Sequence, residues 1–423
     1  MSNAIFTAAV LIAGLLLASV AHLRGKRPTL RTALIVGIGL RVVLLAAAAT
    51  ATPQPLDFIL SFKPAGEAVL AGRDPVLTTN GAWHFLPMIP YLYAPGLWIG
   101  LPWVIAGRLV TVLADIALIP LVGRLAGARN EAGARFAYAC SPIALMIAVI
   151  HGQVEPVALA FLVAAYLAAR SGRGGWTGAL FGFALSTGSW PIILAPVLLV
   201  MLPSWRERGY GAAAAVAVPA SFLVTLPLVV HETWSNLLGL THQLGGVRPI
   251  VGEWGWTAWM TGGNWALAPT AAGIGQVVLY ATLLAVMWAW RRADPVDTTS
   301  AILLAFMVVT PRMGAQYLLW FTPFVIARPT RFSRPALALT ALWAGLGYIY
   351  LTGLTDAGWW HGHQWWSRSS ILVVALLAFA MPWNRREPAT SGRPGHSTSI
   401  SARRSLPRVS RRRRAERAGS PGS

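Results

Sequence analysis

The fold is decided by residues 32–75, which read TALIVGIGLRVVLLAAAATATPQPLDFILSFKPAGEAVLAGRDP. Thr32–Thr52 is a predominantly apolar run, and about 20 such residues are needed for a helix to cross a hydrocarbon core about 30 Å thick. Asp57 follows this run, and Phe58–Ala71 then shows an amphipathic helical pattern that Gly72 ends. Because an ionisable group at membrane depth is energetically costly, this stretch predicts a membrane protein with a functional site at the end of a span.

The composition of the whole chain also indicates a membrane protein. Of its 423 residues, 56% are hydrophobic and only 11% are charged, and the mean hydropathy is +0.58. A soluble domain has about 25% charged residues. Apolar runs recur from Ile5 to Trp383, which predicts an all-α, polytopic membrane domain. The chain has one cysteine, Cys140, so it cannot form an intrachain disulfide or a thiolate metal cluster.

The basic residues are unevenly distributed. The formal net charge is +20, which on its own would be compatible with nucleic-acid binding. The positive residues are instead clustered between apolar runs, as expected for loops that stay in the cytoplasm. The clusters are His22–Arg31, Arg124–Arg135, Arg170–Arg173, Arg206–Arg208, Arg291–Arg292, Arg328–Arg334 and the tail after Asn384.

These clusters predict the topology. The first apolar run, Asn3–Val20, has basic residues after it and none before it, which is the reverse of a secretory signal, and so we expect a retained span with its N-terminus outside. About 13 transmembrane helices then place every basic cluster in the cytoplasm of a bacterial plasma membrane. Residues 1–383 form the predicted membrane domain, with main extracytoplasmic loops at 53–95 and 231–269, and 384–423 form a disordered, Arg-rich cytoplasmic tail.

Asp57 opens the first long extracytoplasmic loop, and two roles fit it. One is a helix cap, in which the carboxylate accepts hydrogen bonds from the first N–H groups of the following helix. The other is a general base, because Asp57 lies at the depth at which a lipid-linked substrate presents its phosphate. From the rest of this loop we expect Lys63, His84, Tyr91 and Tyr93 to contribute to substrate binding.

A second polar group lies in HGQVEP, residues 151–156, between two apolar segments. His151, Gln153 and Glu155 occur at alternate positions of a short turn. Their side chains can hydrogen-bond to the hydroxyl groups of a sugar. The alternative is an ordinary solvated turn without a ligand.

A third group lies in TPRMGAQYLLWFTPF, residues 310–324. Arg312 breaks the positive-inside pattern and therefore needs an anionic partner, for which a phosphate is the natural candidate. Gln316, Tyr317 and Trp320 follow at near-helical spacing. They either line a cavity or, in the case of the two aromatic residues, anchor the chain at the lipid interface.

Other polar residues have weaker interpretations. Arg248 and Glu253 lie in the second long loop, whose aromatic and polar composition is typical of a lid over a binding site. Arg41 and Asp115, inside apolar runs, are expected to form a structural ion pair. His361 and His363 are two residues apart without neighbouring acidic ligands, and we expect no metal site.

These motifs resemble those of the GT-C membrane glycosyltransferases. The resemblance comprises an acidic residue after an outward-going span, the GRDP of the amphipathic segment, YLYAP at 91–95, HGQ at a helix end and PRMGAQYLLW at 311–320. It extends over about Leu56–Phe324 and is closest to the bacterial polyprenyl-phosphate-mannose-dependent α-mannosyltransferases of glycosyltransferase family 87. This chain has Asp57-Phe58 where many relatives have an acid followed shortly by Tyr, and Tyr93-Ala94-Pro95 in place of Tyr-Pro-Pro.

The resemblance implies a GT-C-like hexosyltransferase that builds cell-envelope glycans. It implies inverting transfer of a hexose, with mannose as the first expectation, from a polyprenyl-phosphate donor to a glycolipid or polysaccharide acceptor, and it implies no cofactor. Asp57 would be the general base, and Arg312 together with Arg248 would hold the departing phosphate. The full expected substrate-binding set is Lys63, His84, Tyr91, Tyr93, His151, Gln153, Glu155, Arg248, Arg312, Gln316, Tyr317 and Trp320.

Two other functions fit a helical bundle that contains polar groups. A transporter or lipid-linked oligosaccharide flippase also needs such groups, but its site usually lies near the membrane midplane, often between internal repeats. No convincing repeat is present, and the polar groups here favour one face. A polysaccharide polymerase, or an arabinosyl- or glucosyltransferase on the same scaffold, is the third possibility.

Overall fold

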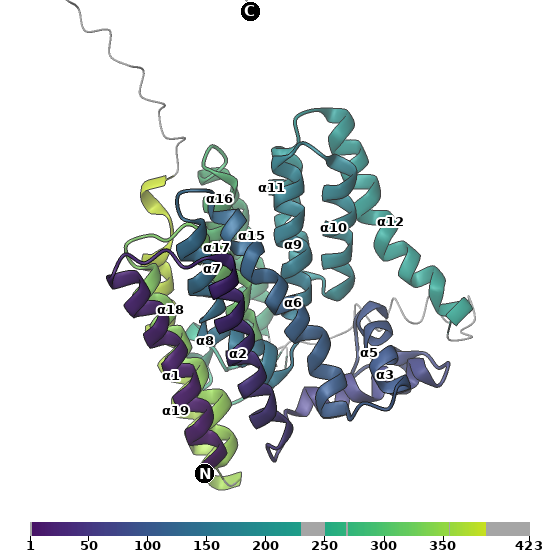
Figure 1. The fold of residues 1–423 in the computed structure, drawn as a ribbon, viewed down its shortest axis with the longest axis vertical. Coiled ribbons are helices and arrows are strands. Elements are labelled where there is room, and N and C mark those ends of the chain that lie inside the picture. Colours follow the sequence, from purple (N-terminus) through teal and green to yellow (C-terminus); the bar gives the residue numbers. More distant parts are fainter. Residues whose placement is uncertain (1, 230–249, 268–269, 355, 386–423) are drawn as a thin grey trace, which may run out of the picture. The chain divides into compact units, whose positions relative to one another are not determined.

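The computed structural model describes residues 2–229, 250–267, 270–354 and 356–385, and these residues are almost entirely helical (Figure 1). Within the described ranges the only sheet is a two-stranded antiparallel pair. Its strands are β1 (Ile250–Val251) and β2 (Ala266–Leu267), with Ile250 opposite Leu267. The predicted tail lies outside the described residues from 386 onward.

The chain begins with two long apolar helices, α1 (Ser2–Leu23) and α2 (Leu30–Ala49), which pack against each other. Thr29 starts α2 by accepting a hydrogen bond from the backbone N–H of Thr32. The connection between the two helices carries the first basic cluster. The opposite end of α2 leads to Asp57, so its 20 residues separate the cluster from the candidate site by about 30 Å.

The first long loop is largely helical. A π-helical segment (Phe58–Phe62) runs into α3 (Lys63–Leu70), which confirms the predicted amphipathic helix. Gly72, at a φ of 68°, follows its end as predicted. Short α4 (Pro75–Thr78) and α5 (Met88–Trp98) complete the loop. Its buried side chains form an apolar cluster with Trp103 of α6, and the loop residues in this cluster include Phe58, Phe62, Ala65, Val69, Trp83, Ile89 and Tyr93.

The central helices run back and forth between the two ends of the bundle. They are α6 (Trp103–Ala126), α7 (Glu131–Ala139), α8 (Pro142–Leu145) with a π-helical continuation (Met146–His151), α9 (Glu155–Arg170), α10 (Gly174–Thr187), a 3-10 segment (Trp190–Leu194), α11 (Ala195–Met201) and α12 (Trp205–Val229). The predicted pair between Arg41 and Asp115 is confirmed, with Arg41 Nη2 lying 2.6 Å from the carboxylate. Tyr138 donates a hydrogen bond of 2.6 Å to the other carboxylate oxygen.

The C-terminal helices complete the bundle. They are α14 (Gly255–Met260), α15 (Thr270–Ala289), α16 (Pro295–Val309), a 3-10 segment (Ala315–Tyr317), α17 (Leu318–Ala327), α18 (Ser333–Gly345), short helical turns (Leu346–Tyr350 and Leu351–Gly353), α19 (Asp356–Ala380) and a final turn (Trp383–Arg385).

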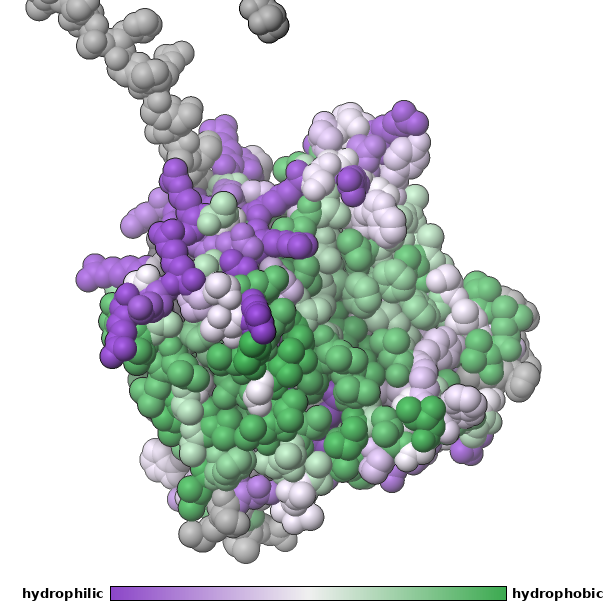
Figure 2. Space-filling model, viewed as in Figure 1, coloured by the Kyte–Doolittle hydropathy of each residue, from purple (hydrophilic) through white to green (hydrophobic). Residues whose placement is uncertain are grey.

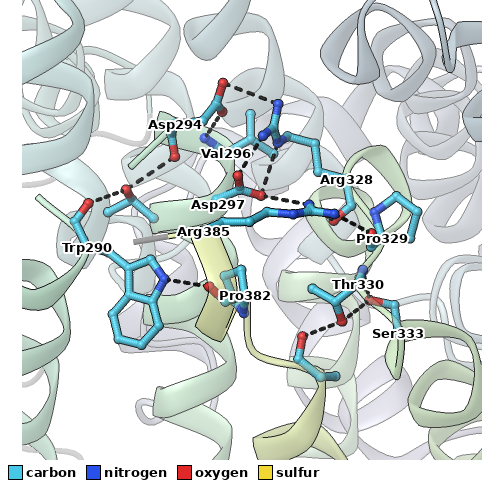
Figure 3. Close-up of polar contacts among 12 residues, drawn as sticks. Trp290, Asp294, Val296, Asp297, Arg328, Pro329, Thr330, Ser333, Pro382 and Arg385 are labelled. Carbon is cyan, nitrogen blue, oxygen red and sulfur yellow. Dashed lines mark hydrogen bonds and ion pairs between the residues drawn. The ribbon is translucent and has the colours of Figure 1, made fainter. Parts of the chain in front are cut away.

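An ionic network joins three of these helices at the end of the bundle that carries the basic clusters (Figure 3). Asp297, near the start of α16, accepts hydrogen bonds from Arg328 Nε and Nη2 at 3.0 and 2.6 Å. Arg385 donates a further hydrogen bond to the same carboxylate at 3.3 Å. Because Arg328 follows α17 and Arg385 follows α19, one buried carboxylate holds the ends of three helices together.

The structure is that of a multi-pass membrane protein. Seven described helices are long and apolar enough to cross a membrane, or eight if the bent pair Glu131–Ala139 and Pro142–His151 is one span. Three further apolar helices among the described residues, Trp190–Met201, Pro295–Val309 and Ala315–Ala327, have only 10 to 17 residues. The predicted total of about 13 crossings therefore remains a prediction.

The visible surface divides into two zones (Figure 2). Hydrophilic residues gather at one end, around the connection between α1 and α2 and the neighbouring helix ends, and a broad hydrophobic surface lies beyond them. We call the hydrophilic zone the basic end, and we define it by Lys26, Arg27, Arg129, Arg291 and Arg334. A hydrophobic surface next to a basic end is expected for helices that face lipid and have basic connecting loops.

Candidate active site

A cavity of about 430 Å³ lies beyond the C-terminal end of α2, away from the basic end. Its walls come from the first long loop, the turn before α9, the end of α10, one face of α15 and the segment after α16. Segments far apart in the sequence thus meet at one site. The predicted residues that line it are Asp57, His84, Gln153, Glu155, Arg312, Gln316, Tyr317 and Trp320.

Asp57 presents its carboxylate to this cavity. Its backbone is already helical, with φ −58° and ψ −39°, and its side chain forms no capping hydrogen bond. Instead, Gln153 Nε2 donates a hydrogen bond of 3.1 Å to Asp57 Oδ2. The structure therefore shows an exposed carboxylate held by an amide rather than the helix cap that was the alternative interpretation.

Arg108 of α6 holds the backbone around Asp57 in place. Its guanidinium group donates to the Gln54 side chain at 2.7 Å and to the carbonyl oxygens of Val149 and Ile150 at 2.7 and 3.0 Å. It also lies 4.2 Å from the centre of the Phe58 ring. Arg108 thus ties the segment before Asp57 to the segment before Gln153. Arg108 was not predicted as a site residue, although an arginine inside an apolar run is a detectable signal.

The turn that carries Gln153 requires a glycine. Gly152 has a φ of 73°, and a Cβ atom there would lie 3.0 Å from the Phe58 ring. This left-handed residue lets the chain reverse at the end of the π-helical segment, which agrees with the short turn predicted at residues 151–156. Gln153 is 3% exposed, and its backbone N–H donates to the Ile147 carbonyl at 3.0 Å. The amide that holds Asp57 is therefore itself firmly positioned.

Glu155 is a second carboxyl group in the cavity wall. It is 7% exposed, and its Oε2 atom is buried without a hydrogen-bond partner in the described structure. Glu155 is the first residue of α9. Burial raises the pKa of its carboxyl group to about 8, and the negative charge of Asp57 adds to the shift. Asp57 and Glu155 are therefore not equivalent acids.

Arg312 supplies positive charge to the cavity. It follows α16, where the Thr310 hydroxyl group donates a hydrogen bond of 2.7 Å to the Arg312 carbonyl. The side chain is partly exposed, and among the described residues no carboxylate forms an ion pair with it. The guanidinium group is therefore available to an anion that enters the cavity.

His84 lies on the loop side of the cavity. Its Nδ1 atom is 3.2 Å from the carbonyl oxygen of Ala82. Burial lowers the pKa of His84 below its ordinary value, and the attraction of Asp57 only partly offsets this effect. This shift favours the neutral imidazole, which adds hydrogen-bonding capacity to the cavity.

Aromatic rings form one wall of the cavity. The Trp190 and Trp320 rings stack with their centres 4.3 Å apart and an angle of 9° between their planes. Tyr317 stacks on the other side of Trp320 at 4.1 Å. Both predicted aromatic residues thus face the cavity, and the stack offers a flat apolar surface beside the polar groups.

Four predicted residues are not brought to the cavity. Lys63 pairs with Glu67 on the exposed side of α3 at 3.8 Å, and the Tyr91 hydroxyl group lies 3.0 Å from that of Thr225. Tyr93 is buried against Trp103, with ring centres 5.1 Å apart. The His151 ring packs on Tyr348 at 4.9 Å. A fifth residue, Arg248, lies outside the described residues.

Other cavity residues were not predicted. They are small polar and aromatic residues at the end of α10 and on α15, namely Thr187, Ser189, Trp190, Gln276 and Tyr280, together with Ser61 and Phe306. The signal for the first three was the polar STGSW, residues 186–190, at the end of an apolar run. Gln276 was detectable as a single amide within an apolar helix.

The described part of the second long loop is held to α16. Trp254 and Trp256 donate indole hydrogen bonds to the carbonyl oxygens of Met307 and Val309 at 2.6 and 3.1 Å. Glu253 accepts a hydrogen bond from Trp265 at 2.8 Å and lies 3.4 Å from His363. These contacts hold the described part of this loop beside the segment that carries Arg312.

Comparison with known proteins identifies the family. Residues 83–311, more than half of the chain, match the model of glycosyltransferase family 87. No curated protein and no solved structure matches the chain. The matched range contains most of the cavity residues, including Gln153, Glu155 and Trp190. The chain therefore belongs to glycosyltransferase family 87 and is a membrane glycosyltransferase.

Proposed function

We propose that this glycosyltransferase transfers a hexose, with mannose as the first candidate, from a polyprenyl-phosphate sugar to a hydroxyl group of a lipid-linked or glycan acceptor. One observation carries the proposal: Asp57 and Arg312 line the same cavity. Transfer from a sugar phosphate needs a group that accepts a proton and a cation that binds the phosphate. Asp57 supplies a carboxylate, and Arg312 supplies a guanidinium group that forms no ion pair with any described residue. The sugar and the donor lipid remain part of the proposal.

The proposed reaction is a single displacement. The acceptor oxygen attacks the anomeric carbon while Asp57 accepts the hydroxyl proton. The bond between the anomeric carbon and the phosphate oxygen breaks, and the polyprenyl phosphate leaves with the electron pair. Attack from the side opposite the phosphate inverts the anomeric configuration. Asp57 can act in this step because Gln153 occupies only Oδ2, which leaves Oδ1 for the acceptor.

Arg312 would bind the phosphate before and after transfer. Its fixed positive charge stabilises the negative charge that develops on the leaving oxygen. The Trp190–Trp320–Tyr317 stack would support the apolar face of the hexose or the first isoprene unit. No group other than the donor and the acceptor is needed for this reaction.

The distribution of basic residues supports a site on the extracytoplasmic face. Basic loops stay in the cytoplasm, and the cavity lies beyond the opposite end of α2 from Lys26 and Arg27. The two ends of α2 are separated by 20 helical residues, or about 30 Å. A site at the end of the spans fits transfer between membrane-bound substrates better than transport through the midplane.

Sugar transfer by membranes that contain the full chain tests this proposal. The donor is polyprenyl phosphate carrying radiolabelled mannose, with glucose and arabinose donors assayed in parallel. We predict that Asp57→Asn lowers the transfer rate by about 100-fold or more, because the amide cannot accept the proton. Glu67→Gln is the matched control, since it makes the same chemical change on an exposed side chain outside the cavity. Wild-type activity in Asp57→Asn would refute the assigned base.

A further inference from the structure

A second cavity, which the proposed reaction does not use, opens at the basic end. It has a volume of about 800 Å³ and lies between α1, α7, α8, α17 and α18. This is within the range of about 300–1,000 Å³ found for small-molecule sites. We call it the basic groove. Its inner wall is apolar and includes Leu15, Ala18, Phe136, Ile143, Val325 and Leu337.

The rim of the basic groove is positively charged. Lys26 and Arg27 come from the connection between α1 and α2, Arg129 from the connection before α7, and Arg334 from the start of α18. His22 lies beside them, with its Nδ1 atom 3.4 Å from Arg334 Nη2. Three separate parts of the chain thus bring cations to one opening, and none of the described Asp or Glu residues lines it.

Among the described residues no acidic side chain pairs with this charge, in contrast to the charges of Arg328 and Arg385. Arg328 and Arg385, at the same end, are paired with two carboxylates, because Arg328 contacts Asp294 and Asp297 and Arg385 contacts Asp297 (Figure 3). In the part of the chain that the structure describes, none of the four rim cations forms an ion pair. The protein therefore supplies counter-charges at this end for one group of arginines and leaves the rim of the groove for an external anion.

The combination of a charged rim and an apolar wall selects the type of ligand. A soluble anion would gain from the rim but not from the wall. An apolar molecule would gain from the wall alone. A lipid with an anionic head group matches both, and basic pockets between transmembrane helices are known to bind such head groups.

We propose that the basic groove is a binding site for an anionic glycerophospholipid. Lys26, Arg27, Arg129 and Arg334 contact the phosphodiester head group, and the acyl chains lie along the apolar wall formed by α1, α8, α17 and α18. The site is independent of sugar transfer, because it lies at the other end of the bundle from Asp57. Its occupant would fasten α1, much of whose surface is exposed, to α18.

Native mass spectrometry of the full-length protein in neutral detergent tests the site. The probes are dioleoyl phosphatidylglycerol and dioleoyl phosphatidylcholine, which share acyl chains and differ in net charge. We expect phosphatidylglycerol to bind about tenfold more tightly or better. Arg129→Gln combined with Arg334→Gln should remove most of this preference. Arg291→Gln combined with Arg292→Gln, at the same end but outside the groove, should leave it intact.

A second variant tests the apolar wall without removing charge. Gly133 lines the groove, and a Cβ atom added there meets no atom within 4 Å. Gly133→Leu should therefore fold normally, fill the groove and weaken binding of phosphatidylglycerol by about tenfold. Gly175→Leu is the matched control, because position 175 is equally open and lies outside the groove.

Four outcomes would overturn the proposal. They are equal binding of the two phospholipids, unchanged binding in both the charge variant and Gly133→Leu, displacement of phosphatidylglycerol by equimolar glycerol 3-phosphate, and at least tenfold tighter binding of a polyprenyl phosphate. The third outcome would indicate a site for a soluble anion, and the fourth a site for a different lipid. None depends on the identity of the sugar transferred at the other end.

Discussion

Glu155 differs from Asp57 because it is buried and has a carboxyl oxygen without a partner. The pKa of Glu155 is raised to about 8, so the group is uncharged at pH 7 and ionises as the pH rises through that value. Ionisation would place a second negative charge beside Asp57 and would repel the phosphate of the donor. We therefore predict that transfer activity falls above about pH 8 because the donor binds less tightly.

Glu155→Gln tests this, since the amide cannot ionise. The ratio of the transfer rate at pH 9 to that at pH 7 should be higher in Glu155→Gln than in the wild-type protein, with the difference in the KM for the donor. Glu67→Gln should keep the wild-type ratio, because its carboxylate is exposed and outside the cavity. An alkaline decline that persists unchanged in Glu155→Gln would assign it to another group.

Residues that line the cavity were predictable where polarity interrupts an apolar pattern. Asp57, Gln153 and Arg312 were found in this way, because a polar side chain at the end of a span needs a reason to be there. Tyr93 and His151 show the limit of the approach. Whether a side chain faces a cavity or a neighbouring helix depends on helix rotation, which packing against distant segments determines.

At the scale of elements, Arg108 links α6 to the segment before Asp57 and to the segment before Gln153. These contacts position Asp57 and Gln153. Lysine at this position would keep the charge but could not reach Gln54, Val149 and Ile150 together, because its ammonium group is a single point. Each buried carbonyl group left without a partner costs about 1–3 kcal/mol. We predict that Arg108→Lys lowers both thermal stability and kcat, with little change in the KM for the donor.

Arg41→Lys is the control for this variant, because it makes the same change at another fully buried arginine. Arg41 pairs with Asp115 and does not line the cavity. Arg41→Lys should lower the melting temperature yet preserve kcat per folded molecule, as measured by thermal unfolding and sugar transfer on the same preparations. Equal losses of kcat in the two variants would mean that Arg108 acts only through stability.

The positions of helices in the sequence were more predictable than the number of times these helices cross the membrane. The amphipathic segment after Asp57 was predicted to end before Gly72, and it does, because apolar spacing and a left-handed glycine are local signals. The break between α7 and α8 at Ser141–Pro142 was not predicted. A run of apolar residues does not reveal whether two bent helices make one crossing or two, since that depends on tertiary packing.

At the scale of the whole molecule, orientation is the prediction on which the extracytoplasmic site depends. The basic end carries Arg292 and the other end carries Asp57. The positive-inside rule places the first in the cytoplasm and the second outside. The native Cys140 is fully buried, so a cysteine introduced at an exposed position would be the reactive thiol. Asp57 and Arg292 are both exposed and are therefore suitable positions.

We predict that a membrane-impermeant maleimide added to intact cells labels Asp57→Cys and leaves Arg292→Cys unlabelled until the membrane is permeabilised. The wild-type chain should remain unlabelled in both conditions, which controls for Cys140. The reverse pattern would place the cavity in the cytoplasm, where the proposed donor would have to present its sugar on the inner leaflet. Labelling of both positions in intact cells would instead show that an even number of crossings lies between residues 57 and 292, and the topology of the helices between them would have to be reassigned.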